Sequence, residues 1–110
     1  MELSITAQAK EIINQWKEPH HHYLLLHYDT DDCGCGVSGL PTIRLVEKID
    51  NTYYSVENDD FNVMIHHQQS IFFADKIKLH YKGNGFRLSS PEGILNPIIS
   101  AHDLVKGDVS

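Results

Sequence analysis

The segment from Lys76 to Leu88 limits the possible folds of this chain more than any other stretch. Polar and apolar residues alternate through Lys76–Lys82, the turn signal Gly83-Asn84-Gly85 follows, and Phe86-Arg87-Leu88 resumes the alternation. Successive side chains of a strand point to opposite faces, and glycine and asparagine are favoured in tight hairpin turns. The segment therefore predicts a β-hairpin with one buried and one exposed face, which requires an antiparallel sheet.

A second pattern lies near the N-terminus and predicts one amphipathic helix over residues 7–17. Thr6 is a favoured N-cap residue, and Pro19 cannot continue a helix. Apolar residues recur at helical spacing between them, at Ala9, Ile12, Ile13 and Trp16. A stripe of this kind packs against another element, so we expect Ile12, Ile13 and Trp16 to belong to the core.

Three strands are predicted between this helix and residue 57. Tyr23–Tyr28 carries three consecutive leucines, which makes it apolar on both faces and is typical of a buried central strand. Residues 42–49 alternate, and Asp50-Asn51 is a turn signal. We therefore expect residues 52–57 to return as the partner strand of a second hairpin.

The remaining segments give weaker signals. Residues 61–65 predict a short strand, and Ser70-Ile71-Phe72-Phe73 predicts a single helical turn with its aromatic rings packed inward. After Leu88, Pro91 and Pro97 interrupt any periodicity. We expect the last dozen residues either to fray or to dock as a short helix.

Together these elements predict an α+β fold, with one N-terminal helix packed on a mixed, mostly antiparallel sheet of about six strands. A chain of 110 residues suits one domain with one hydrophobic core, so residues 1–110 are expected to form a single domain. We expect the inner face of the sheet to include Leu24 or Leu25, Ile77, Leu79, Phe86 and Leu88.

Composition excludes several classes of function. Nine Lys and Arg against fifteen Asp and Glu give a net charge of −6, which argues against a nucleic-acid-binding protein. No apolar run approaches the roughly 18 residues of a membrane-spanning helix. Residues 1–6 lack the basic and apolar regions of a signal peptide, so we expect a cytoplasmic protein. In that compartment thiols stay reduced, and paired cysteines serve as metal ligands or redox groups more often than as disulfides.

Both cysteines of the chain lie in the segment Asp29–Gly39, as Cys33-Gly34-Cys35. Two thiolates spaced in this way can reach one metal ion, because thiolate–metal bonds are about 2.3 Å long. The glycines at 34, 36 and 39 allow the backbone to approach a bulky ligand closely. Cys33 and Cys35 are therefore the predicted metal and cofactor ligands. The structural alternative is a glycine-rich turn in which the cysteines are small apolar fillers. A disulfide between them would be strained.

Other ligand candidates are weaker. His20-His21-His22 is a run inside the chain, but adjacent side chains on an extended segment point to opposite faces and cannot act as one chelate. His66 and His67 are expected at the end of a strand. Asp29, Asp31 and Asp32 either contribute a carboxylate to a metal or form a solvated loop face. The common nucleotide-binding and hydrolase motifs are absent.

The order of these elements resembles the HesB-like, or A-type, iron–sulfur cluster biogenesis proteins. The matching positions are Leu3-Ser4-Ile5-Thr6, Ala9, Ile12, residues 23–39, Asn62-Val63-Met64-Ile65, Ser70, and Gly85-Phe86-Arg87-Leu88. The resemblance implies a HesB-like fold that binds iron or an iron–sulfur cluster. It also implies an accessory role as a carrier or scaffold, without catalytic turnover. The implied partners are cluster-assembly proteins or apo-protein acceptors.

The chain departs from the pattern of this family in its cysteines. Typical members have one cysteine in the loop after the first long strand and a C-G-C pair near the C-terminus, whereas residues 36–110 contain no cysteine here. The chain therefore looks like a divergent branch of the family. Either Cys33 or Cys35 matches the single loop cysteine.

Three functions follow from these observations. The leading hypothesis is an iron or iron–sulfur binding accessory protein, in which a homodimer would supply four thiolates, or a mononuclear iron or zinc would add a histidine or carboxylate ligand. The second is an interaction or regulatory module of the same fold that has lost metal binding. The third is a thiol redox enzyme, although no adjacent Lys or Arg lowers a thiol pKa.

Overall fold

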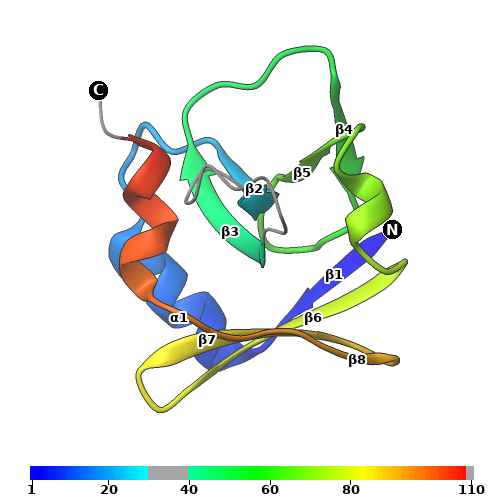
Figure 1. The fold of residues 1–110 in the computed structure, drawn as a ribbon. Helices are drawn as coiled ribbons and strands as arrows, with labels where there is room; N and C mark the ends of the chain where they lie inside the picture. The colour runs from blue at the N-terminus through cyan, green and yellow to red at the C-terminus, as the bar shows by residue number, and fades with distance from the viewer. Residues whose placement is uncertain (30–39, 109–110) are drawn as a thin grey trace.

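The computed structural model describes residues 1–29 and 40–108, and in this part of the chain eight strands form two four-stranded sheets (Figure 1). In chain order the elements are β1 (Glu2–Ile5), α1 (Ala7–Trp16), β2 (Tyr23–Asp29), β3 (Leu40–Val46), β4 (Tyr53–Val56), β5 (Val63–His66), the 3-10 helix η1 (Ser70–Phe72), β6 (Lys76–Lys82), β7 (Gly85–Ser90), β8 (Gly93–Ile99) and the 3-10 helix η2 (Ala101–Asp108). None of the helices in the described ranges is long and apolar enough to span a membrane.

The predicted hairpin is confirmed as β6 and β7. Its strands pair antiparallel, with Lys82 opposite Gly85, so Gly83 and Asn84 alone form the turn. Gly83 has a φ of 68°, a conformation that glycine adopts without a steric penalty. Ile77 and Leu79 are buried and Lys76 and Lys78 are exposed, as the alternation requires.

The predicted helix is confirmed as α1, which ends one residue earlier than expected. The Thr6 hydroxyl accepts a hydrogen bond from the backbone N–H of Ala9 at 3.3 Å and caps the first turn. Ile13 is fully buried, and Ile12 and Trp16 pack against the core. The rings of Trp16 and His102 are nearly perpendicular, with centroids 6.1 Å apart.

The inner faces of both sheets, α1 and η2 enclose one hydrophobic core. Its buried members include the sheet residues predicted from alternation: Leu24, Ile77, Leu79, Phe86 and Leu88. Leu104 of η2 has no exposed surface, so the C-terminal segment docks as a short helix rather than fraying.

The expectation of one sheet with about six strands is wrong, because the strands divide into the orders β1-β6-β7-β8 and β3-β2-β5-β4. Two strands were missed. β1 is only four residues long and pairs in parallel with β6. β8 contains Pro97, which removes one backbone donor and reads as a strand breaker. A proline is tolerated there because β8 lies at the edge of its sheet.

The expected second hairpin is also wrong in its pairing. β4 pairs antiparallel with β5, and β5 separates it from β2 and β3. The turn itself is real, since the Asp50 carboxylate accepts hydrogen bonds from the hydroxyl and the backbone N–H of Thr52. These bonds hold the pKa of Asp50 below its usual value of 3.8. A local turn signal therefore predicted the bend and not the partner strand, which long-range packing selects.

The central position of β2 is confirmed, because it pairs antiparallel with β3 and parallel with β5. The helical turn at residues 70–73 is confirmed as η1, but only one of its two aromatic rings packs inward. Phe73 is buried, whereas Phe72 is 44% exposed and stacks on Tyr28. This stacking places η1 against the end of β2.

Candidate metal-binding loop and its supporting contacts

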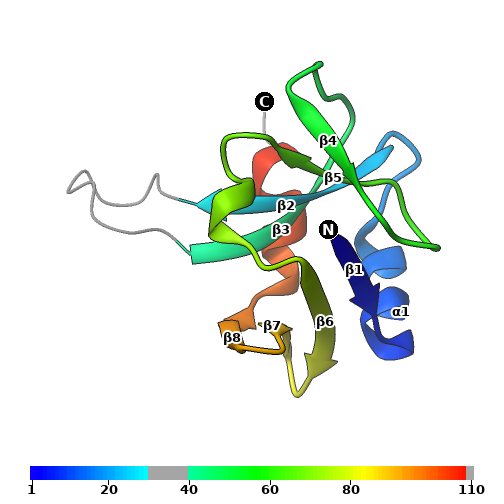
Figure 2. The same ribbon diagram turned by 90° about the vertical axis from the view of Figure 1, so that its right-hand side faces the viewer.

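The predicted ligands Cys33 and Cys35, with Asp31 and Asp32, lie outside the described residues. The structure does describe the strands that lead into and out of this segment. β2 ends at Asp29 and β3 begins at Leu40, and these two residues are paired in the antiparallel register. Figure 2 shows the end of β2 beside the start of β3 at one side of the molecule. The segment that contains both cysteines therefore connects two adjacent strands.

The end of β2 is held by residues around η1. The backbone N–H of Tyr28 donates to Oε1 of Gln69 at 3.1 Å, and Nε2 of Gln69 donates to the carbonyl of Tyr28 at 3.4 Å. The side-chain amide of Gln69 thus pairs with both backbone groups of Tyr28, as a neighbouring strand would. The Phe72 ring stacks on the Tyr28 ring, with centroids 3.9 Å apart and an angle of 7° between the planes.

The start of β3 is held from the other sheet. Nδ2 of Asn96 in β8 donates to the carbonyl of Pro41 at 2.8 Å, and Oδ1 of Asn96 accepts from the backbone N–H of Ile98 at 3.2 Å. Asn96 is 6% exposed, so its amide is buried and satisfied on both sides. Sequence analysis missed these roles of Gln69, Phe72 and Asn96, since nothing in their local pattern indicates partners 41, 44 and 55 positions away.

One face of the β2–β3 ladder carries polar side chains toward this connection. His27 lies opposite Thr42, and Leu25 lies opposite Arg44. The Thr42 hydroxyl is buried and has no hydrogen-bond partner among the residues described. His27 is half-buried and lies two positions before the last residue of β2. The structure thus places an imidazole on the strand that leads into the cysteine segment.

The histidine run lies at the opposite end of β2 and has a structural role. His21 is 1% exposed, and its Nδ1 accepts a hydrogen bond from the backbone N–H of Glu18 at 2.9 Å. The rings of His20 and His21 lie 4.1 Å apart, so the expectation that neighbours in this run point apart is wrong for this pair. His20 lies in a turn that the hydrogen bond from the His21 N–H to the Glu18 carbonyl closes, so the run does not begin as an extended strand.

His66 is the last residue of β5, which confirms the expected strand end. The His66 and His67 rings stack at 5.1 Å, and Tyr53 and Tyr54 of β4 contact them from the neighbouring strand. Within residues 1–29 and 40–108, no group of three or more His, Cys, Asp or Glu side chains is arranged to hold a metal ion.

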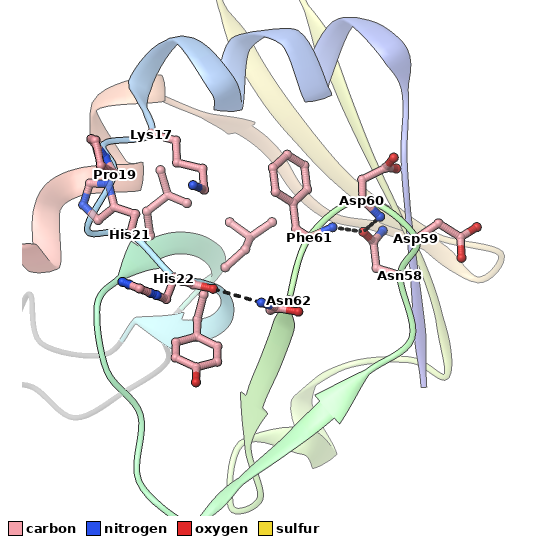
Figure 3. Close-up of a pocket in the computed structure, with 12 residues that line it drawn as sticks. Lys17, Pro19, His21, His22, Asn58, Asp59, Asp60, Phe61 and Asn62 are labelled. Atoms are coloured by element: carbon pink, nitrogen blue, oxygen red, sulfur yellow. Dashed lines mark hydrogen bonds between the residues drawn. The ribbon is translucent and has the colours of Figure 1, made fainter.

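The pocket of about 380 Å³ shown in Figure 3 lies between the segment after α1 and residues 58–62. Hydrogen bonds hold its rim together. Nδ2 of Asn62 donates to the carbonyl of His22 at 3.3 Å, and Oδ1 of Asn58 accepts from the backbone N–H groups of Asp60 and Phe61. Tyr23, at the start of β2, lines this pocket. A strand of this length spans roughly 20 Å, so the pocket is separate from the cysteine segment.

With the fold and the position of the cysteine segment established, the chain can be compared with known protein families. The sequence model described as "Iron-sulphur cluster biosynthesis" matches residues 1–103. The chain belongs to this iron–sulfur cluster biosynthesis family, which confirms the resemblance seen in the sequence. Proteins of this family are accessory or carrier proteins and generally not enzymes, so membership supports a role in cluster assembly.

The chain is also similar to individual proteins. The chain is 32% identical over 103 residues to the uncharacterized protein YqkB of Bacillus subtilis (strain 168), covering 91% of this chain and 96% of the relative. A candidate Fe–S biosynthesis protein from Lactobacillus salivarius has a TM-score of 0.72 at 17% identity, over 91% of this chain and 95% of that one. Escherichia coli SufA, which is involved in the biosynthesis of iron–sulfur clusters, has a TM-score of 0.61 at 19% identity, over 84% and 82%. At these identities the solved structures show a shared fold.

Proposed function

We propose that this protein is an accessory factor of iron–sulfur cluster assembly that binds iron or a cluster through Cys33 and Cys35 and passes it to an acceptor. The observation that carries the proposal is the position of the two cysteines in the fold. The only two cysteines of a chain in this family occupy the connection between β2 and β3. Such a role requires no catalytic turnover, and it requires the reduced thiols that a cytoplasmic location maintains.

The number of thiols sets the expected assembly. A cluster is usually held by four cysteine thiolates, and each chain supplies two. Two chains related by a twofold axis would supply all four, with the cluster at the interface and exposed enough for transfer. Asp29, Asp31 and Asp32 would repel their counterparts until the positive charge of iron offsets them. The apo-protein is then monomeric or weakly dimeric.

The contacts at the strand ends support this use of the connection. Gln69 and Phe72 hold Tyr28, and Asn96 holds Pro41, so both strands entering the segment have fixed positions. A segment whose two ends are already held in place loses less conformational entropy on binding a ligand than a segment with free ends. His27, on the strand before it, offers an imidazole as an additional ligand for a mononuclear iron or zinc.

Anaerobic reconstitution with ferrous iron and sulfide tests the proposal. Wild-type protein, Cys33→Ser and Cys35→Ser are compared by visible absorption, by iron and sulfide analysis, and by sedimentation. We expect the wild type to form a cluster-bearing dimer and either serine variant to lose the stable cluster, because two of four thiolates disappear. Ser38→Ala changes the same segment without removing a thiol and should behave as wild type. Asp31→Asn should weaken binding only modestly.

The outcomes separate the alternatives. A monomer that keeps iron and sulfide in cluster ratio contradicts the dimer, and retention of the cluster without both cysteines contradicts the site. Iron without sulfide on a monomer favours the mononuclear site. A folded protein that takes up neither favours the second candidate, an interaction or regulatory module. The absence of cysteine from residues 36–110 favours that module.

A further inference from the structure

The outer face of the sheet β1-β6-β7-β8 carries features that cluster binding does not use. Figure 1 shows β6, β7 and β8 along the bottom of the molecule, with the other elements above them. The inner face of this sheet belongs to the core. On the outer face Lys78 lies opposite Ser89, and His80 lies opposite Arg87. Among the described residues of this face, Lys78 and Arg87 are exposed and His80 and Ser89 are partly exposed.

Cations gather on this face although the protein as a whole is acidic. Four of the nine Lys and Arg residues lie on it: Lys76, Lys78, Lys82 and Arg87. All four are exposed. The ion pair found within the described ranges is Lys10–Asp60, so none of the four lies within ion-pair distance of a described carboxylate. The β1–β6 register does place Glu2 beside Lys76 on this face, so Lys78, Lys82 and Arg87 carry most of its positive charge. A local positive surface therefore stands on a chain with a net charge of −6.

The pKa of His80 is consistent with this positive surface. Burial lowers the pKa of its imidazole below the usual 6.5, and the charges of Lys78 and Arg87 lower it further. Both cations act on His80 because one lies two positions away on the same face of β6 and the other lies directly across the ladder.

Exposed apolar side chains lie beside the cations. Ile94 is 56% exposed and pairs with Ser89, which places it on the outer face. Ile98 is 62% exposed, and its side chain lies over Gly85, since a Cβ added to Gly85 would be 2.6 Å from Cγ1 of Ile98. A groove of about 330 Å³ also lies on this face, and Glu2, Lys76, Lys78 and Ser89 are among the residues that line it.

We propose that this outer face is a docking surface for an acidic partner protein, one that presents carboxylates together with apolar side chains. Charge complementarity supports this occupant. An acidic surface is attracted by Lys78 and Arg87 and repelled by the net charge of the rest of the chain, so it approaches in one orientation. The exposed isoleucines favour a protein surface over a purely ionic ligand, because desolvation of apolar area adds to the attraction.

The strand β8 links this face to the cysteine connection. Ile94 and Ile98 point outward, while Asn96 between them is buried and bonds to the carbonyl of Pro41. A partner on the outer face therefore lies against the strand that holds the start of β3. The docking proposal goes beyond metal binding and does not depend on it.

The test is a nuclear magnetic resonance titration of isotope-labelled apo-protein with a short peptide that alternates glutamate and leucine. We expect chemical-shift changes confined to β1, β6, β7 and β8, and a dissociation constant that rises with salt because the charges are exposed. Polyglutamate should bind more weakly to the same residues. Lys78→Glu/Arg87→Glu should weaken binding by about tenfold or more, and Ile94→Ser/Ile98→Ser by a smaller factor.

The matched control is Lys17→Glu/Lys48→Glu, which changes the net charge equally at exposed positions on other surfaces. It should bind as wild type. Equal weakening by the control, or shift changes spread over other elements, overturns the proposal. Binding to phosphatidylglycerol vesicles but not to the peptide also overturns it, in favour of an anionic lipid surface. Cys33→Ser/Cys35→Ser should bind the peptide normally, so a failure of metal binding leaves this result unaffected.

Discussion

The two hairpins β2–β3 and β6–β7 differ in how their ends are held. The β6–β7 ladder closes within the chain itself, through Gly83 and Asn84. The β2–β3 ladder opens into residues 30–39, and side chains from distant parts of the sequence hold its last residues. A two-residue turn offers few side chains for binding, whereas a longer connection between supported strand ends offers more. The cysteines therefore lie in the connection whose flanking strand ends are held by long-range contacts, and not by a local turn.

The largest expected effect on stability is in the hairpin β6–β7, here called the self-closed hairpin because its own turn closes it. Leu79 has no exposed surface and lies in the core, so Leu79→Ala should destabilise the protein by about 3 kcal/mol, through lost burial and an unfilled cavity. Urea denaturation measures this free energy of unfolding. Lys82→Ala, at an exposed position of the same strand, should change stability by less than about 0.5 kcal/mol. Equal effects would show that the β6–β7 face does not organise the core.

The hairpin β2–β3, whose ends are held by distant side chains, should lose stability when Asn96 is replaced. Asn96→Ala removes a buried amide and leaves the Pro41 carbonyl without its partner, which should cost about 2 kcal/mol. Hydrogen exchange should also increase at the ends of β2 and β3. Asn62→Ala is the control, since this exposed amide also donates to a backbone carbonyl, that of His22. If both variants lose the same small amount, Asn96 does not hold the hairpin.

A smaller effect on stability is expected just before β2, where it distinguishes a structural role of the histidine run from a role in metal binding. His21→Ala should cost about 1 kcal/mol or more in thermal or urea unfolding, because the Glu18 N–H loses its acceptor inside the protein. His22→Ala, at an exposed position, should be close to neutral.

Replacing His20, His21 and His22 together by Gln should lower stability but leave bound iron per chain unchanged. Iron analysis of the reconstituted variant measures this. Loss of most of the iron from a folded variant would show that the run is part of the site.

The parts of the fold that sequence predicted are those fixed by short-range pattern. Alternation located β6 at its observed bounds, and the spacing of Ile13 and Trp16 with the cap at Thr6 located α1. Partner choice failed where it depends on distant packing, as for β4, whose turn at Asp50 was predicted and whose partner β5 was not. β8 was missed because Pro97 is compatible with a strand only at a sheet edge, and position in the sheet is not a local property.

The site divides in the same way. The C-x-C spacing of Cys33 and Cys35 is a local signal and remains a prediction, because these residues lie outside the described ranges. The supporting residues Gln69, Phe72 and Asn96 are ordinary in sequence, and only the tertiary fold brings them to the ends of β2 and β3. The outer face of β6 and β7 was predicted as exposed, but its relation to Ile94 and Ile98 depends on β8.

The smallest expected effect tests the outer face of the self-closed hairpin through His80. Its pKa is below 6.5 in the folded protein, because burial and the charges of Lys78 and Arg87 disfavour the imidazolium. The unfolded chain therefore binds more protons as the pH falls through 6.5, and stability decreases in that direction. Lys78→Gln should raise the pKa of His80 toward 6.5 and reduce this decrease, whereas Lys48→Gln should change neither. A proton–carbon NMR titration of the His80 ring measures the pKa, and a wild-type value at or above 6.5 would contradict a concentrated positive charge on this face.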